Sequence, residues 1–205
     1  MPMNRTLPWL TCLAVCLPTL SLLGMELMES GQTGELARVL LAQAVAVEKK
    51  EWEGNPEEAR GVMDETGKIV VIPRTTLMED LRDPAVMTEE GALLGGLFLS
   101  RGFSPLVEGK AIESDRLPVV PVKGVDGADE ELVYLRLTVR HLGEGEWRLL
   151  VFGADEKPLF DSPFAASPEP GEGKMDVRVV ELDSEHRRLI VRVFGKYESG
   201  FAIAN

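Results

Sequence analysis

Hydrophobic and polar residues alternate along two stretches in the second half of the chain, residues 132–153 and 175–195. In the first stretch the apolar positions are Val133, Leu135, Leu137 and Val139. The residues between them are Tyr134, Arg136, Thr138 and Arg140. The second stretch repeats the pattern, with Leu189, Val191 and Val193 set against Arg188 and Arg192. Side chains along a strand point to opposite faces in turn, so each stretch predicts a β-hairpin with one aliphatic face.

Several shorter apolar runs predict further strands. Residues 68–73 read as a buried strand that ends at a proline, and residues 117–123 read as an edge strand because their two prolines cannot donate to a neighbour. Residues 159–160 and 201–204 complete the set. Short strands separated by glycine-rich and proline-rich turns favour a mainly β or α+β chain whose C-terminal part is an antiparallel β-sandwich, immunoglobulin-like in general architecture.

Helical spacing is found in the first half of the chain. Residues 34–52 place leucine and valine three or four positions apart among alanines, and Gly54-Asn55-Pro56 should end this helix. Residues 75–83 and 88–102 predict two more helices. Gly91, Gly95 and Gly96 fall inside the last one and would let another backbone approach closely. We expect the helices to pack on their own domain.

The N-terminus carries an uncharged apolar run from residue 7 to residue 24, preceded by Arg5. Such a run is typical of a signal peptide or a membrane anchor and predicts export to a periplasmic, extracellular or membrane-anchored location. We therefore divide the chain into a signal peptide or anchor (1–24), a helical N-terminal portion with one short strand (25–110) and a β-sandwich domain (111–205).

Charge and cysteine content limit the function classes. The chain of 205 residues has a formal charge of −12, which disfavours binding to nucleic acid and to anionic membrane surfaces. Its two cysteines, Cys12 and Cys16, both lie inside the apolar run. The rest of the chain therefore has no cysteine nucleophile, thiolate zinc site or disulfide.

The residues that most often carry catalysis form no known pattern here. His141 lies at the end of a strand on its aliphatic side, and His186 lies in a turn. Ser104 and Ser199 lack the flanking glycines of an exposed nucleophile. We assign no catalytic residue, no cofactor and no metal ligand from these residues.

Acidic residues offer two further possibilities. Residues 126–131 hold four carboxylates in a glycine-containing turn, a donor set that suits calcium but lacks the spacing of a calcium loop, so we expect a solvated turn. A pair of carboxylates is also what glycoside hydrolysis needs. With 34 acidic residues in the chain, some pairs will lie close together by chance.

Aromatic and arginine side chains are the remaining surface candidates. Trp147 shares the aliphatic side of its strand and should be in the core, whereas Tyr134 lies on the opposite side and is the one candidate for an exposed aromatic residue, which is little support for carbohydrate binding. Arginines recur on the polar strand faces, at positions 136, 140, 148, 178 and 192. We expect them to pair with the chain's own carboxylates, the alternative being an acidic partner.

The sequence thus favours an exported, non-catalytic binding or structural protein. Its partner would be a protein or a glycan of the cell envelope, with a possible membrane tether through residues 7–24. A carboxylate-dependent secreted hydrolase, for example one acting on glycans, is the alternative.

Overall fold

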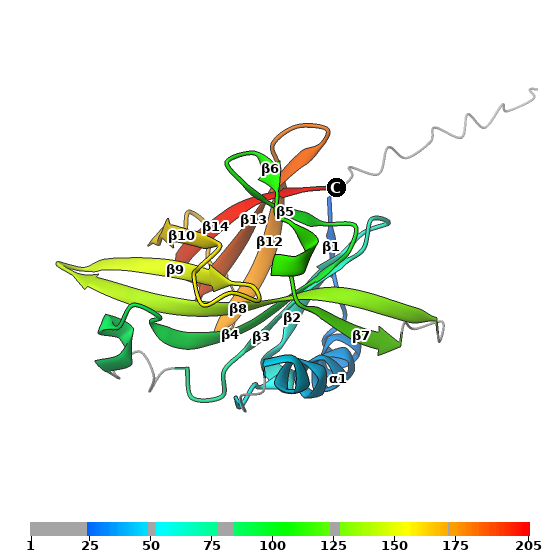
Figure 1. Cartoon of the computed structure of the whole chain (residues 1–205), viewed down its shortest axis with the longest axis horizontal. Helices are drawn as coiled ribbons and strands as arrows, with labels where there is room; N and C mark the ends of the chain where they lie inside the picture. The colour runs from blue at the N-terminus through cyan, green and yellow to red at the C-terminus, as the bar shows by residue number, and fades with distance from the viewer. Residues whose placement is uncertain (1–23, 49–51, 78–83, 124–127, 172) are drawn as a thin grey trace, which may run out of the picture.

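A computed structural model describes residues 24–48, 52–77, 84–123, 128–171 and 173–205. The described residues form three layers: helix α1 (Ser30–Glu48) packs on one face of a large antiparallel sheet, and a second antiparallel sheet packs on the other face (Figure 1). The predicted fold class, mainly β or α+β with antiparallel sheets packed together after an N-terminal helix, is confirmed. The predicted signal or anchor (1–24) lies outside the described residues except for Gly24.

The first sheet has eight strands within the described ranges. They are β1 (Glu26–Leu27), β2 (Arg60–Met63), β3 (Lys68–Pro73), β4 (Ala92–Ser100), β7 (Val119–Lys123), β8 (Asp129–Gly143), β9 (Glu146–Phe152) and β10 (Phe160–Pro163). Their order is β1-β2-β3-β4-β8-β9-β10, with β7 paired to the first half of β8 and β9 to its second half. The long strand β8 is the centre of this sheet.

The second sheet has six strands in the described part of the chain. They are β5 (Ser104–Val107), β6 (Lys110–Ala111), β11 (Ala165–Ala166), β12 (Met175–Glu181), β13 (His186–Val193) and β14 (Tyr197–Ala204). The order is β12-β13-β14-β5-β6, and β11 pairs with the first residues of β14. Among the residues that the structure describes, three short 3₁₀ helices lie in the connections: η1 (Pro56–Glu58), η2 (Pro84–Met87) and η3 (Ser114–Arg116).

The two predicted hairpins are confirmed as β8–β9 and β12–β13. The predicted alternation also holds. Every second residue from Val133 to Val139 lies in the core between the two sheets, as a period of two requires. Leu135 and Leu137 are fully buried there. Alternate residues of β3 and β4 extend the same core: Ile69, Val71, Leu97 and Leu99.

Helix α1 covers the other face of the first sheet. Its buried residues follow a helical spacing and are mostly small: Thr33, Gly34, Ala37, Leu40 and Ala44. They enclose a second core with the outward-facing side chains of β3, β4 and β8, including Val70, Phe98 and Tyr134. Small residues on the helix allow it to lie close to the sheet. The helix predicted over 34–52 is therefore present, with bounds shifted to Ser30–Glu48.

The helix predicted over residues 88–102 is wrong, because Ala92–Ser100 form the strand β4 between β3 and β8. Two of the three glycines, Gly91 and Gly95, do admit another backbone as predicted, whereas Gly96 faces side chains. A Cβ added to Gly95 would lie 2.1 Å from the carbonyl oxygen of Ile72 on β3. The helix predicted over 75–83 falls largely outside the described residues.

Strands on both sides of the expected boundary at residue 110 pair with one another. β4 lies beside β8 along nearly its whole length, and β5 pairs with β14. Residues 52–110 thus supply strands to both sheets. On one side of the sandwich the chain passes directly from β10 of the first sheet to β11 of the second through Phe164.

Candidate functional site

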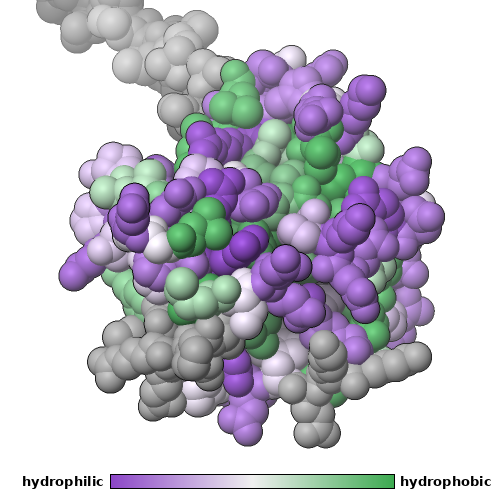
Figure 2. All heavy atoms as spheres, turned by 60° about the vertical axis from the view of Figure 1, so that its left-hand side comes forward, coloured by the Kyte–Doolittle hydropathy of each residue, from purple (hydrophilic) through white to green (hydrophobic). Residues whose placement is uncertain are grey.

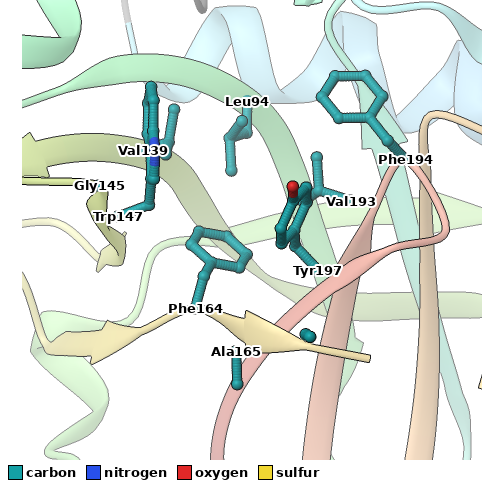
Figure 3. A pocket seen from close by; sticks show the side chains of 10 residues that line it. Leu94, Val139, Gly145, Trp147, Phe164, Ala165, Val193, Phe194 and Tyr197 are labelled. Carbon is teal, nitrogen blue, oxygen red and sulfur yellow. The ribbon is translucent and has the colours of Figure 1, made fainter. Parts of the chain in front are cut away.

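An apolar pocket of about 400 Å³ opens between the two sheets. It lies near the turn of the β8–β9 hairpin and the turn between β13 and β14, and both sheets contribute to its walls (Figure 3). The lining residues are Leu94, Val139, Gly145, Trp147, Phe164, Ala165, Ala166, Val193, Phe194 and Tyr197. Six of the described strands or their turns therefore meet at this pocket.

Leu94 reaches the pocket because β4 contains a bulge. The register with β8 shifts between Leu93 and Gly95, so Leu94 is an extra residue in the strand. The bulge reverses the alternation, and Leu94 faces the core between the sheets on the same side as Leu97. Its backbone carbonyl accepts a hydrogen bond of 2.8 Å from the amide of Arg74, which holds the bulge in place.

Trp147 forms the wall on the side of the first sheet. It packs against the core as predicted but is only partly buried, and its ring borders the pocket. The ring of His141, opposite it on β8, stacks on the indole with centroids 4.4 Å apart and planes 22° apart. His141 therefore supports the indole and is not a residue of the pocket lining.

The link between β10 and β11 supplies the wall on the side of the second sheet. Phe164 lies at the point where the chain crosses between the sheets and points into the pocket (Figure 3). Ala166 lies directly opposite Tyr197, so these two side chains share one face. Tyr197 is 53% exposed, which leaves an aromatic ring accessible at the pocket.

Phe194 lines the pocket from the turn between β13 and β14. Its φ is 54° and that of Gly195 is 63°, the pair of positive values that a type I′ turn requires. Glu108-Gly109 and Glu144-Gly145 make turns with similar angles. A bulky aromatic residue in this left-handed region is unusual and strained.

Three backbone hydrogen bonds hold this strained turn. The amide of Phe194 donates to the carbonyl of Lys174 at 2.8 Å. The amides of Ser167 and Gly171 donate to the carbonyls of Lys196 and Gly195, at 2.7 and 3.1 Å. Ser167, Gly171 and Lys174 thus hold the backbone of the turn from which the Phe194 side chain extends.

The pocket lining is uncharged. None of its ten residues, all within the described ranges, carries an acidic or basic side chain. The charged residues adjacent in sequence to the lining include three exposed ones, Glu144 and Glu146 on either side of Gly145 and Lys196 beside Tyr197, and four half-buried ones, Arg140, Arg148, Arg192 and Glu198. In Figure 2 apolar side chains show through breaks in a mainly hydrophilic surface.

A second hollow of about 790 Å³ lies beside α1 and is lined by Arg38, Leu41, Ala42, Val45, Trp52, Glu53 and Arg74. It is larger and more open to solvent than the first. The pocket between the sheets is therefore the stronger candidate site.

The candidate catalytic residues of the sequence do not meet at this pocket. His186 is held in its turn by Asp183, whose carboxylate lies 2.9 Å from Nδ1. Ser199 is buried, and its hydroxyl donates to the carbonyl of Ser162 at 3.3 Å. Ser104 is a half-buried residue at the start of β5. Neither His186 nor the two serines line the pocket.

Four of the five arginines on the strand faces pair with the chain's own carboxylates, as expected. Arg148 contacts Asp161, Arg178 contacts Glu198, and Arg192 contacts Asp176 at 2.7 Å. Arg136 lies 3.6 Å from Glu48 and over the ring of Phe152. Within the described residues Arg140 has no ion pair, and its Nε is buried without a hydrogen bond.

The acidic turn of residues 126–131 is described only from residue 128. Its three described carboxylates each contact a basic side chain: Asp129 with Lys123, Glu130 with Lys68 at 2.6 Å, and Glu131 with Arg101 at 3.0 Å. The described residues contain no group of three or more side chains suited to hold a metal ion.

Tyr134 is not the accessible aromatic residue that the alternation suggested. It is 1% exposed because α1 covers this part of the sheet, and burial raises the pKa of its hydroxyl well above the usual value. At the pocket, Tyr197 is exposed, whereas Phe164 and Phe194 are half-buried. Tyr197, Phe164 and Phe194 were missed because they lie at strand ends and in a turn, where the alternation carries no information.

Comparisons of the chain with known protein families, with curated proteins and with solved structures find no match. In the ranges that the structure describes, no helix has the length and the apolar content needed to cross a membrane.

Proposed function

We propose that the protein is an exported, non-catalytic binding protein that holds an apolar group of its partner in the pocket between the sheets. The observation that carries the proposal is the pocket itself: aromatic and aliphatic side chains from both sheets surround about 400 Å³ of space. Pockets that bind small ligands or anchoring side chains are concave, mainly apolar and largely formed in advance. This pocket has all three properties.

Filling the pocket would release apolar surface from water. Burying apolar area contributes about 25 cal/mol for each Å², so covering the exposed ring faces of Trp147 and Tyr197 favours binding without any new ion pair. The walls are held by strand pairing and by the braced turn at Phe194. Little ordering is therefore needed when a ligand enters.

Export is proposed from the sequence alone. The apolar run 7–24 supports a signal peptide or a tether, and the strongly acidic remainder favours solubility of the domain. The partner or ligand would then be a component of the cell envelope or of the surrounding medium. Fractionation that finds the full chain, with Met1 retained, in the cytoplasm would contradict this part of the proposal.

The hydrolase alternative has less support. A carboxylate-dependent glycosidase needs two carboxyl groups facing each other across the bound sugar. The pocket lining contains none, and most of the carboxylates named above contact a lysine, an arginine or His186. This pocket suits binding and not carboxylate chemistry.

The test is a titration of the full chain with N-phenyl-1-naphthylamine, an uncharged dye that fluoresces when it enters an apolar site. The variant Ala166→Trp places an indole on the face that Ala166 shares with Tyr197 and should fill the pocket. We expect it to weaken dye binding at least tenfold.

The matched control is Ala111→Trp, an exposed alanine on the short strand β6, away from the pocket. It should leave dye binding unchanged. Dye that binds to the apolar N-terminal run contributes equally in both variants, because they share this run. The difference between the variants therefore reports on the pocket. Equal affinities for the wild-type chain and Ala166→Trp would refute binding at this pocket.

A further inference from the structure

We propose that the pocket selects an uncharged apolar ligand of small-molecule size, and that the ring of Phe194 contributes to binding it. The inference rests on the proposed function and adds to it the chemical class of the ligand. It combines three observations: the size of the pocket, the absence of charge from its lining, and the left-handed backbone of Phe194.

The size indicates one or two ring systems or a short chain. A volume of about 400 Å³ lies near the lower end of the range of about 300–1,000 Å³ found for small-ligand sites. The pocket is too small to enclose a folded segment. Trp147 and Phe194 stand at opposite sides of it, with Leu94, Phe164 and Tyr197 between them (Figure 3).

The lining determines the charge that the ligand can carry. A charged group that enters a site with no partner loses its hydration and gains nothing in return. All ten lining residues are uncharged, so a charged group would have to stay outside the pocket. At the β8–β9 turn it would meet Glu144 and Glu146, and the whole chain carries a formal charge of −12. An anionic ligand is therefore disfavoured inside the pocket and near this turn. Lys196 is exposed at the turn between β13 and β14, so the uncharged lining and not the surrounding charge carries the selection.

Phe194 occupies a position where phenylalanine is a poor choice for the backbone. Asparagine and glycine adopt positive φ far more readily, and the other two turns of this kind carry no large apolar residue there. The three backbone hydrogen bonds with Ser167, Gly171 and Lys174 hold the turn in place and so maintain the strain. The ring of Phe194 lies at the pocket. Contact between this ring and a ligand explains why phenylalanine occupies a position that the turn itself disfavours.

The first experiment compares two dyes on the full chain. N-phenyl-1-naphthylamine is uncharged, and 8-anilino-1-naphthalenesulfonate has the same two ring systems with an added sulfonate. We expect the uncharged dye to bind at least tenfold more tightly, with the difference abolished in Ala166→Trp. Equal affinity of the two dyes in the wild-type pocket overturns the inference but leaves the proposed function standing. No binding of either dye overturns both.

The second experiment replaces Phe194 with asparagine, which suits the left-handed backbone. We expect Phe194→Asn to weaken binding of the uncharged dye at least fivefold while the chain stays folded, as judged by its midpoint in urea. Glu108→Asn makes the same change in the turn between β5 and β6, away from the pocket, and should leave dye binding unchanged.

Dye affinity is measured on the folded protein in the absence of urea. It therefore tests the role of Phe194 even if the substitution changes the midpoint of urea unfolding. Unchanged affinity in Phe194→Asn overturns that role. If the asparagine variant does not fold, the dye affinity of Phe194→Leu is measured instead. Leucine keeps an apolar side chain but lacks the ring. Affinity equal to that of the wild-type chain in the leucine variant overturns the role of the ring.

Discussion

Arg187 and Asp64 are 123 residues apart in the sequence and form an ion pair between the two sheets, with Nη1 and Oδ2 2.5 Å apart. The side chains are 10% and 15% exposed. Asp64 also caps its own turn by accepting hydrogen bonds from the amides of Thr66 and Gly67. The pair therefore ties the turn between β2 and β3 to the start of β13.

Replacing Arg187 with methionine should destabilise the protein by about 3 kcal/mol, because it leaves a mostly buried carboxylate without its partner. The double variant Asp64→Asn, Arg187→Met should lose less than the sum of the two single changes. Urea unfolding of the four proteins measures the coupling. Strictly additive costs would show that the pair contributes nothing of its own.

The same pair predicts a dependence of stability on pH. Burial by itself would raise the pKa of Asp64, but the hydrogen bond from Arg187 and those from the two amides hold the pKa below its ordinary value of 3.8. The stability that this lowered pKa contributes is present above about pH 4 and is lost as the pH falls below it. The difference in unfolding free energy between the wild-type protein and Asp64→Asn should therefore shrink from pH 5 to pH 3. A difference that stays constant over this range would contradict the lowered pKa.

The alternation along β8 predicts different costs for two neighbouring residues. Leu137→Ala should cost about 2–5 kcal/mol, because Leu137 is fully buried between the sheets. Arg136→Ala should cost about 1 kcal/mol, since its guanidinium lies 4.5 Å from the centre of the Phe152 ring and its side chain is 21% exposed. Chemical denaturation of both variants tests the order. An equal or larger cost at Arg136 would mean that the faces of the strand are exchanged.

Gly95→Ala tests whether residues 92–100 form a strand. In a helix this change would stabilise the protein by about 1 kcal/mol. In the strand β4 the new Cβ would lie 2.1 Å from the carbonyl oxygen of Ile72, so we expect a loss of about 1–3 kcal/mol. Measuring the unfolding free energy gives the sign of the change, and the sign alone separates the two structures.

The pattern of neighbouring residues correctly predicts the two hairpins, the buried side of β8 and one edge strand. The alternation in residues 132–153 and 175–195 predicts both hairpins and the buried side of β8, because a strand with one apolar face has a period of two. The prolines of residues 117–123 likewise predict an edge strand, and β7 pairs only with β8 among the described strands.

Long-range packing explains two wrong predictions, the helix over residues 88–102 and the exposure of Tyr134. Residues 92–100 contain leucine and glycine and no β-branched residue, so their propensity favours a helix over a strand. Pairing with β3 and β8 on both sides overrides that propensity. Tyr134 was expected to be exposed because the alternation shows which side of a strand a residue takes, but not that α1 covers that side.

The pocket was not predicted, because its walls come from segments far apart in the chain. Leu94 reaches it only through a bulge, and Phe164 only because the chain crosses between the sheets beside it. A large aromatic residue before the glycine of a tight turn, Phe194-Gly195, was the one local sign of an unusual position.

The pairing of β14 sets an order in which the molecule can be completed. β14 lies between β13 and β5, and its Ala202 is opposite Leu106, almost a hundred residues earlier. Closing a loop of that length is slow, and β5 has no neighbour on this side until residues 197–204 have joined it. Val193, Phe194 and Tyr197 all belong to this last hairpin. Dye binding would therefore appear late in refolding, and a chain arrested before residue 197 would have a nearly complete first sheet but no binding activity.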